Sequence, residues 1–329
     1  MVAAEAGVTR STVSRALNGE PDVSAATIEH VRAVAARLNY VPNRAARSLA
    51  SARTMAIALV IPEPGQLALA DPHLIALMAG VSRRIEQSDY LLNLMVSGGA
   101  DAASGSSKLQ RYLSSGVVDG VLVASQHTRD AWMLHLHDTL PVVFGGRPSE
   151  QTDPPNYFID VDNRGAASAA VQFLIDSGRR RIATITGPAD MSAASDRVAG
   201  WRDTLTAAGL PADLEVPGDF TAASGAAGVT TLLDRAPDID AIFAANDVMA
   251  AAAVAALLDA GRRVPDDVAV LGFDDSTAAL TARVPLTTVN QPSERMGELM
   301  ADTLLRVLDG EDVPVSTVVE SRLVRRGSA

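Results

Sequence analysis

The chain has 329 residues, of which 47% are hydrophobic and 20% charged, with a net charge of −11 and no cysteine. This length suggests two or three compact units, and the composition is that of an ordinary soluble globular protein. The lack of cysteine excludes disulfide scaffolds and thiolate metal sites, and no run of 18 apolar residues could span a membrane.

The first 53 residues form a basic segment in an acidic chain, because they hold seven arginines against four acidic residues. A basic head on an acidic body is expected when only the head contacts phosphate, although in so short a segment charge alone could be a chance fluctuation. The N-terminus lacks a basic region followed by an apolar stretch, which argues against secretion and predicts a cytoplasmic protein.

Short helices without any strand pattern are predicted for residues 1–40. The break before Thr9 leads into a helix over about Arg10–Leu17, and Asn18–Pro21 has the composition of a turn. Ser24 is expected to cap a further helix, which ends before Tyr40–Asn43. Together these elements predict a small all-helical head.

The Arg10–Leu17 helix has two faces that fit the second helix of a helix-turn-helix. The apolar face, with Val13 and Leu17, would dock on the neighbouring helix, while polar residues such as Arg10 and Arg15 would face base edges in the major groove. Arginine is the side chain best suited to donate two hydrogen bonds to the O6 and N7 atoms of guanine. The pattern alone leaves open a generic three-helix module with solvated arginines.

After Thr54, apolar strand-like runs alternate with helical segments, and the basic stretch Asn43–Arg53 before them could be a helix or a linker. Buried strands with helical crossovers are typical of an α/β domain with parallel sheets. The predicted strands are Met55–Ile61, Tyr90–Val96, Val117–Ala124, Pro141–Phe144, Tyr157–Val161, Arg181–Thr186, Ile239–Ala244 and Val268–Phe273. The predicted helices are His73–Ser88, Gly165–Ser177, Arg197–Ala208, Asp247–Ala260 and Ser293–Leu308.

The run from Ala3 to Asn18, AAEAGVTRSTVSRALN, closely resembles the helix-turn-helix signature of the lactose/galactose repressor (LacI) family. Val23-Ser24, Leu38–Asn43 and Ala46–Leu49 continue the resemblance in the same order, and it extends to the C-terminus. It implies an N-terminal all-α helix-turn-helix head with a hinge helix, followed by a two-lobed α/β sensor domain of the periplasmic-binding-protein type. No cofactor and no metal is implied.

The resemblance assigns DNA contacts to the head. It implies that Arg10, Ser11 and Arg15 read bases, and that Thr9, Ser14 and Asn18 position the helix on phosphates. Asn43–Ala50 resembles the hinge helix of the family, in which Leu49 would wedge into a base step from the minor groove while small neighbours such as Ala46 allow close approach. Leu49 could instead be an ordinary linker hydrophobe.

One departure from the family pattern concerns Met1, which stands where the pattern has a polar residue inside the first helix. We therefore expect a shortened first helix, and weaker DNA binding than for a version of the chain extended upstream. Equal affinities of the two versions in parallel titrations would refute this expectation.

The resemblance also implies domain boundaries: a head over 1–42, a hinge over 43–53 and a sensor over 54–329. The first lobe would comprise about 54–160 and 291–320, and the second about 161–290 plus the C-terminal strand. The chain would cross between the lobes near Asp160–Asn163, near Thr288–Gln291 and near the C-terminal strands. Ligands of such folds bind between the lobes, at the carboxyl ends of strands.

Three polar residues at expected strand ends or helix starts, Arg197, Asn246 and Asp274, match the effector contacts of the family. Each could be a simple cap or turn residue when considered alone. Together, a guanidinium, an amide and a carboxylate can bind vicinal hydroxyls, which favours a sugar. Phe220 matches a position where family members stack an aromatic ring on the ligand.

Weaker effector contacts are expected from Gln291 at a crossover and from Asp71 and Arg147 in the first lobe. Many family members have an aspartate where Gly146 stands, so one hydroxyl acceptor is missing. Arg147 could compensate for it, which would favour a ligand with an acidic group or a different hydroxyl pattern.

An enzyme is not expected, because no G-x-S-x-G, P-loop or H-E-x-x-H motif occurs. His135 and His137 with Asp138 could suggest a metal site, but residues two apart on a helix point apart, so solvated surface is the preferred interpretation. A sugar-binding transport protein would share the body, but it would need a signal peptide and no basic head.

The function predicted from the sequence is therefore a homodimeric repressor of sugar-utilisation genes, bound to a pseudo-palindromic operator and released by a small sugar-like effector. The sequence leaves open the reverse switch, in which the ligand acts as a co-repressor.

Overall fold

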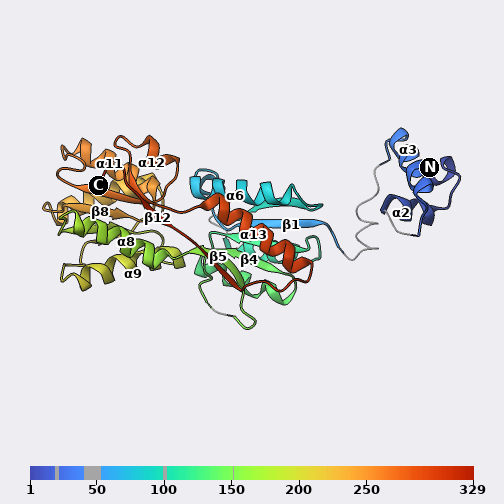
Figure 1. The fold of residues 1–329 in the computed structure, drawn as a ribbon. Helices are drawn as coiled ribbons and strands as arrows, with labels where there is room; N and C mark the ends of the chain where they lie inside the picture. The colour runs from blue at the N-terminus through green and yellow to red at the C-terminus, as the bar shows by residue number, and fades with distance from the viewer. Residues whose placement is uncertain (19–21, 41–52, 99–101, 151) are drawn as a thin grey trace. The chain divides into compact units, whose positions relative to one another are not determined.

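The computed structural model describes residues 1–18, 22–40, 53–98, 102–150 and 152–329. The chain divides into two compact units, Met1–Met55 and Ala56–Ala329, shown in Figure 1. Within the described ranges, no helix is both long enough and apolar enough to cross a membrane.

The described residues of the first unit form the helices α1 (Val2–Glu5), α2 (Arg10–Asn18) and α3 (Ala25–Arg37). The expected caps are present, because the hydroxyl of Thr9 accepts from the Thr12 amide at 3.1 Å and that of Ser24 accepts from the Thr27 amide at 3.2 Å. The apolar faces meet in one small core of Val2, Ala6, Val13, Ala16, Val31, Val34 and Ala35. This core fixes α2 against α3 and leaves the polar face of α2 outside.

The second unit contains two six-stranded sheets. The first sheet has the strand order β11-β5-β4-β3-β1-β2, and the second has the order β12-β10-β9-β8-β6-β7. All the pairings are parallel except that of β12 with β10. The strands are β1 (Ala56–Ile61), β2 (Leu91–Val96), β3 (Gly120–Ala124), β4 (Val142–Gly145), β5 (Tyr157–Val161), β6 (Ile182–Ile185), β7 (Glu215–Val216), β8 (Ala241–Ala244), β9 (Ala269–Asp274), β10 (Thr287–Asn290), β11 (Ser316–Val319) and β12 (Arg322–Val324).

Each sheet lies between helices, which makes two three-layer lobes. In the first lobe, α6 and α13 cover one face of the sheet, and α7 and η1, a 3-10 helix, cover the other. In the second lobe, α8 and α9 pack together on one face, while α10 and α11 pack on the other. The helices are α5 (Gly65–Ala68), α6 (Pro72–Ile85), α7 (Ala102–Leu113), η1 (Thr128–Asp138), α8 (Asn163–Asp176), α9 (Ser192–Ala207), α10 (Ala222–Arg235), α11 (Asp247–Asp259), α12 (Thr277–Thr281) and α13 (Ser293–Leu308). The α/β class predicted from the sequence is confirmed.

The chain passes between the two lobes along three segments of the described structure. The first leads from β5 to α8, the second from β10 to α13, and the third from β11 to β12. Figure 1 shows α13 in red beside α6 in the first lobe, and the C-terminal segment returning to the second lobe. Residues at the first two crossings therefore lie at the junction of both lobes.

The contact between α6 and α13 depends on two glycines that let the helix backbones approach closely. A Cβ added at Gly80 would meet the backbone of Glu294, and one added at Gly297 would meet the carbonyl of Leu77. Both obstacles are backbone atoms, which cannot move aside as the end of a side chain can. The packing of α13 onto the first lobe therefore requires glycine at these positions.

We predict that Gly297→Ala lowers the free energy of unfolding by about 1–3 kcal/mol, because the added methyl group overpacks this contact. Gly65→Ala is the matched control, since the nearest atom to its added Cβ lies 4.0 Å away. Urea unfolding of both variants measures the difference, and equal midpoints would contradict this account of the helix contact.

Candidate functional site

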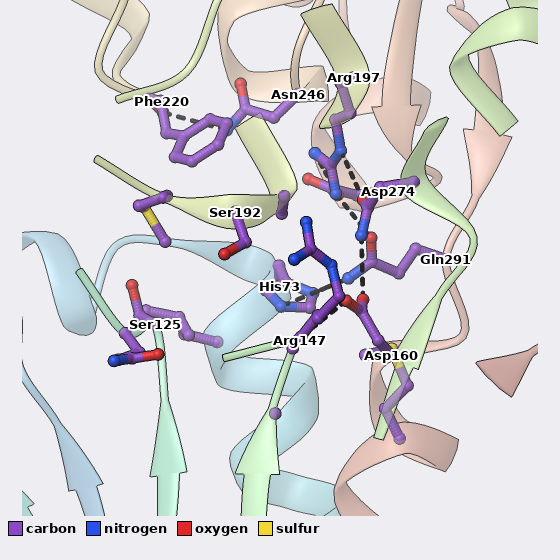
Figure 2. Close-up of a pocket in the computed structure, with 18 of the residues that line it drawn as sticks. His73, Ser125, Arg147, Asp160, Ser192, Arg197, Phe220, Asn246, Asp274 and Gln291 are labelled. Atoms are coloured by element: carbon purple, nitrogen blue, oxygen red, sulfur yellow. Dashed lines mark hydrogen bonds and ion pairs between the residues drawn. The ribbon is translucent and has the colours of Figure 1, made fainter. Parts of the chain in front are cut away.

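A polar cleft lies between the lobes at the carboxyl ends of their strands, as expected for parallel sheets. It contains about 730 Å³ of empty space, part of it open to solvent. Figure 2 shows that both lobes contribute side chains to this inner cleft. All seven effector contacts expected from the sequence line it: Asp71, Arg147, Arg197, Phe220, Asn246, Asp274 and Gln291.

Arg197, near the start of α9, is the central group of the inner cleft and is only 4% exposed. Its guanidinium donates to the side chain of Asn163 at 2.9 Å, to the amide oxygen of Gln291 at 2.8 Å and to the Ala245 carbonyl at 2.5 Å. The ring of Phe273 lies beneath it, 3.6 Å from the guanidinium carbon. These contacts hold a buried cation in one orientation, as recognition of a ligand in a defined geometry requires.

Asp274 at the end of β9 is the charge partner of this guanidinium. Its carboxylate lies 3.7 Å from Arg197 and is 8% exposed. Burial raises the pKa of the Asp274 carboxyl, and the nearby Arg197 opposes that rise. Because this carboxyl makes no closer ion pair in the described structure, it can accept hydrogen bonds from a ligand in the cleft.

Asn246 both caps a helix and lines the cleft, so the two interpretations of this residue are compatible. Its side-chain oxygen accepts from the Met249 amide at 2.9 Å, and its amide nitrogen donates to the Phe220 carbonyl at 3.1 Å. Phe220 has a positive φ of 65° and packs on Gly187, where a side chain would collide with its ring. The cap thus also fixes the aromatic ring beside the cleft.

In the first lobe, Asp71 and Arg147 are held by other protein groups. The Asp71 carboxylate caps α6 by accepting from the His73 amide at 2.8 Å. The Arg147 guanidinium donates across the cleft to Asp196 of the second lobe at 2.7 Å. Arg147 therefore acts first as a bridge between the lobes, and its positive charge is already matched by a carboxylate.

Several cleft residues were not predicted from the sequence, and Asp160, Asn163 and His73 are the main ones. The Asp160 carboxylate accepts from the Arg147 amide at 2.8 Å and from the Asn163 side chain at 2.9 Å, so it orients the partner of Arg197. His73 lies 3.2 Å from the Gln291 amide. Asp160 and Asn163 stand at a predicted crossover between the lobes, and this position could have identified them as cleft residues. For His73 the only indication in the sequence was its place two residues after Asp71.

A second group of side chains connects the lobes near the cleft, and we call it the clasp: Glu63, His127, Arg129 and Asp190. His127 is 4% exposed and its two ring nitrogens lie 2.7 Å from Glu63 and 2.8 Å from Asp190. Arg129 donates to Asp190 at 3.3 Å. Asp190 belongs to the second lobe and the other three residues to the first, so the clasp joins the two lobes.

The clasp favours the charged form of its histidine. Burial acts to lower the pKa of His127, but the hydrogen bonds to Glu63 and Asp190 outweigh it, so the pKa lies above the ordinary value of 6.5. The stability that the protonated clasp contributes is therefore fully present below pH 6.5 and is lost as the pH rises through the folded-state pKa.

In the first unit, α2 presents the polar face expected to bind nucleic acid. The side chains of Thr9, Arg10, Ser11 and Ser14 are exposed, and Arg15 is half-buried in an ion pair with Asp22. Asn18 is the last residue of α2. The expected hinge contacts Asn43, Ala46 and Leu49 lie outside the described residues.

The histidines considered as a metal site do not form one. No group of three metal-ligating side chains occurs in the part of the chain that the structure describes. His135 is exposed as expected, but His137 is partly buried and its ring lies 2.6 Å from the Leu134 carbonyl, so the solvated-surface interpretation was wrong for His137.

A helix-turn-helix unit followed by a two-lobed α/β unit with a polar cleft defines a DNA-binding transcription regulator with a ligand-sensing body. Residues 2–43 match the model for bacterial regulatory proteins of the lacI family, and residues 171–329 match the periplasmic binding protein-like domain. The chain is 46% identical to the HTH-type transcriptional regulator CelR of Thermobifida fusca, over 100% of this chain and 97% of that relative. The chain belongs to the lacI family.

Solved structures of other regulators resemble the whole chain. The CelR–cellobiose complex has a TM-score of 0.80 at 44% identity, covering 100% of this chain and 98% of that one. The lac repressor dimer bound to operator and the anti-inducer ONPF has a TM-score of 0.86 at 30% identity, covering 99% of this chain and 97% of that one. The family and the fold inferred from the sequence are thus confirmed.

We predict that Glu63→Gln lowers the pKa of His127, because the variant removes one of the two carboxylates that stabilise the imidazolium. Glu150→Gln, an exposed carboxylate of the first lobe, is the control. An NMR titration of the imidazole resonances measures both, and an unchanged His127 pKa in Glu63→Gln would contradict the clasp geometry.

Proposed function

We propose that this protein is a sugar-responsive repressor in which Arg197, Asn246 and Asp274 bind the effector, and that it regulates transcription and catalyses no reaction. The observation that carries the proposal is the fixed pair of Arg197 and Asp274 in a cleft between two lobes. Such a pair can donate to one hydroxyl of a sugar and accept from its neighbour. The relatives support it, since CelR has been solved with cellobiose.

The charges of the cleft favour a neutral effector. Arg147 and Arg197 are both matched by carboxylates, and Asp71 and Asp160 add further negative charge to the lining. An acidic group on the ligand would meet these carboxylates without a free cation among the described lining residues. We therefore favour an uncharged sugar over the acidic ligand that Arg147 alone suggested.

The effector is proposed to act on DNA binding through the lobes. Because the cleft lining comes from both lobes, a ligand changes the free energy of one lobe arrangement relative to another. The sensor would then favour or disfavour the operator-bound form of the head, with release by the effector as the proposed direction.

Homodimerisation is the proposed assembly, with two heads on a pseudo-palindromic operator. Edge strand β2 exposes Leu91 and Leu94, each 48% exposed, and Val96 at 38%, and on α6 Ile75 is 46% exposed. An exposed apolar edge strand promotes aggregation, and contact with a partner subunit would bury it. The related lac repressor was solved as a dimer on operator.

For the DNA-binding part, we predict that Arg10→Ala weakens specific binding to the operator by about 1–3 kcal/mol, because α2 loses an exposed guanidinium that we propose contacts bases. Arg263→Ala, an exposed arginine of the second lobe, is the control. Fluorescence anisotropy on DNA from upstream of the gene measures both at fixed salt. Equal affinities of wild-type protein and Arg10→Ala would exclude Arg10 as a base contact.

For the effector, we predict that Asp274→Asn lowers sugar affinity by about 1–3 kcal/mol, since one hydroxyl loses its charged acceptor. Operator binding without sugar should be retained, which shows that the variant is folded. Asp234→Asn, exposed on α10, is the control. Isothermal titration calorimetry with a sugar panel gives the affinities, and undiminished binding by Asp274→Asn would remove Asp274 from the site.

A further inference from the structure

His127 is the clasp residue whose ordinary pKa lies near neutrality, and its ring stands between carboxylates of different lobes. Its Nε2 atom lies 2.7 Å from Glu63 of the first lobe, and its Nδ1 atom lies 2.8 Å from Asp190 of the second. An ionised carboxylate only accepts hydrogen bonds, so the two contacts together require a proton on both ring nitrogens. The imidazolium can make both bonds, whereas a neutral imidazole has a single N–H group and can make only one of them.

The bond to Asp190 is the one that a neutral His127 would lose. The Glu63 side chain is 12% exposed and also accepts from the Ser125 hydroxyl at 2.6 Å, so it stays fixed beside the ring. The Asp190 side chain is 35% exposed and can be hydrated when it loses a donor. The single N–H group therefore stays with the more buried carboxylate, and the bond between the lobes is the one that breaks.

The charged groups around His127 are mainly acidic. Arg129 is the cation of the clasp, and it donates to Asp190 at 3.3 Å. Burial lowers the pKa of His127, but the bonds to the two carboxylates outweigh it, so the ring loses its proton only as the pH rises above 6.5. Further acidic groups lie beside His127 on η1 or line the same cavity between the lobes: Asp130, Asp71 and Asp219.

We propose that His127 is a proton-operated switch between lobe arrangements: its protonated ring joins the lobes through Glu63 and Asp190, and loss of the proton releases Asp190 and lets the lobes separate. This inference goes beyond the proposed function, because the proton is an input of its own and acts without an effector. The ratio of the two arrangements changes about tenfold for each unit by which the pKa of His127 differs between them.

The switch also has a consequence for the effector, and this consequence alone rests on the proposed function. Side chains of both lobes line the inner cleft in this arrangement, so separation of the lobes would pull the effector contacts apart. By linkage, a proton that stabilises the arrangement also strengthens effector binding. Sugar affinity is therefore expected to fall as the pH rises through the pKa of His127.

The test measures the separation of the lobes directly and without any ligand. Because the chain contains no cysteine, Leu69→Cys in the first lobe and Ala223→Cys in the second allow the full chain to be spin-labelled at two defined positions. Both positions are exposed, and each is next to a residue that lines the cavity between the lobes. Labelled chains are diluted with unlabelled protein, so that each distance lies within one chain. Double electron–electron resonance then gives this distance from about pH 5.5 to about pH 9.

We expect one transition above pH 6.5, from a shorter distance to a longer one, with its midpoint at the pKa of His127 measured by NMR. Asp190→Asn should abolish the transition and keep the shorter distance throughout, because its amide nitrogen can donate to the bare ring nitrogen while its oxygen still accepts from Arg129. His135→Asn changes an exposed histidine on η1 and is the matched control, which should keep the transition.

Three results would overturn the switch. The first is a distance that does not change with pH in the wild-type background. The second is a transition that persists in Asp190→Asn, since a group outside the clasp would then cause it. The third is a longer distance at every pH in Asp190→Asn, which would show that Asp190 joins the lobes whatever the charge of His127.

Calorimetric titrations with the sugar panel at about pH 6 and about pH 8.5 test the consequence for the effector. Wild-type protein should bind its sugar more weakly at the higher pH, and Asp190→Asn should bind it equally at both. Equal affinities of wild-type protein at the two pH values would refute the link between proton and effector. Wild-type protein that binds no sugar at either pH would contradict the proposed function, while the switch is still decided by the distance between the labels.

Discussion

The buried guanidinium of Arg197 is the interaction on which the cleft depends. A buried charge is tolerated only when hydrogen bonds and an opposite charge compensate for its lost hydration. Here the compensation comes from Asn163, Gln291 and the Ala245 carbonyl, with Asp274 nearby. Asn163 follows the first crossing between the lobes, and Gln291 lies at the second. The guanidinium therefore connects the cleft to the segments about which the lobes would move.

This placement gives a physical basis for sensing. A ligand that hydrogen-bonds Arg197 or Asp274 competes with, or adds to, bonds that already involve the crossings. Away from Arg197, the lobes are also joined by the hydrogen bond from Arg147 to Asp196 and by the clasp around His127. Several polar contacts near the cleft thus join the lobes in this arrangement, and a bound sugar that changes them would change the balance between lobe arrangements.

The sequence predicted most of the architecture because its signals were local. The eight predicted strands all occur: seven are largely buried apolar runs, and β2, at the edge of its sheet, is an apolar run that is partly exposed. The apolar pattern did not predict β7, β10, β11 and β12, which are only two to four residues long, and the family resemblance alone implied strands near the C-terminus. Helices α7 and α10 were missed because serine and glycine at their starts hide the helical pattern.

The site was predictable only where the family pattern named a residue. Arg197, Asn246 and Asp274 do line one cleft, but their partners Asn163 and Asp160 are recognised only once the crossings are folded. The pairing of Arg147 with Asp196 and of His127 with Asp190 joins residues 49 and 63 positions apart in the chain, from different lobes. No local periodicity encodes such contacts, so the clasp could not have been found from the sequence.

A regulator that senses a ligand requires its cleft and its DNA-binding head to be thermodynamically coupled. The most direct test measures operator affinity by anisotropy as a function of sugar concentration, and sugar affinity by calorimetry with and without operator. We expect the sugar to weaken operator binding and the operator to weaken sugar binding by the same factor, as linkage requires. Sugar binding that is tight yet identical on free and operator-bound protein would contradict it.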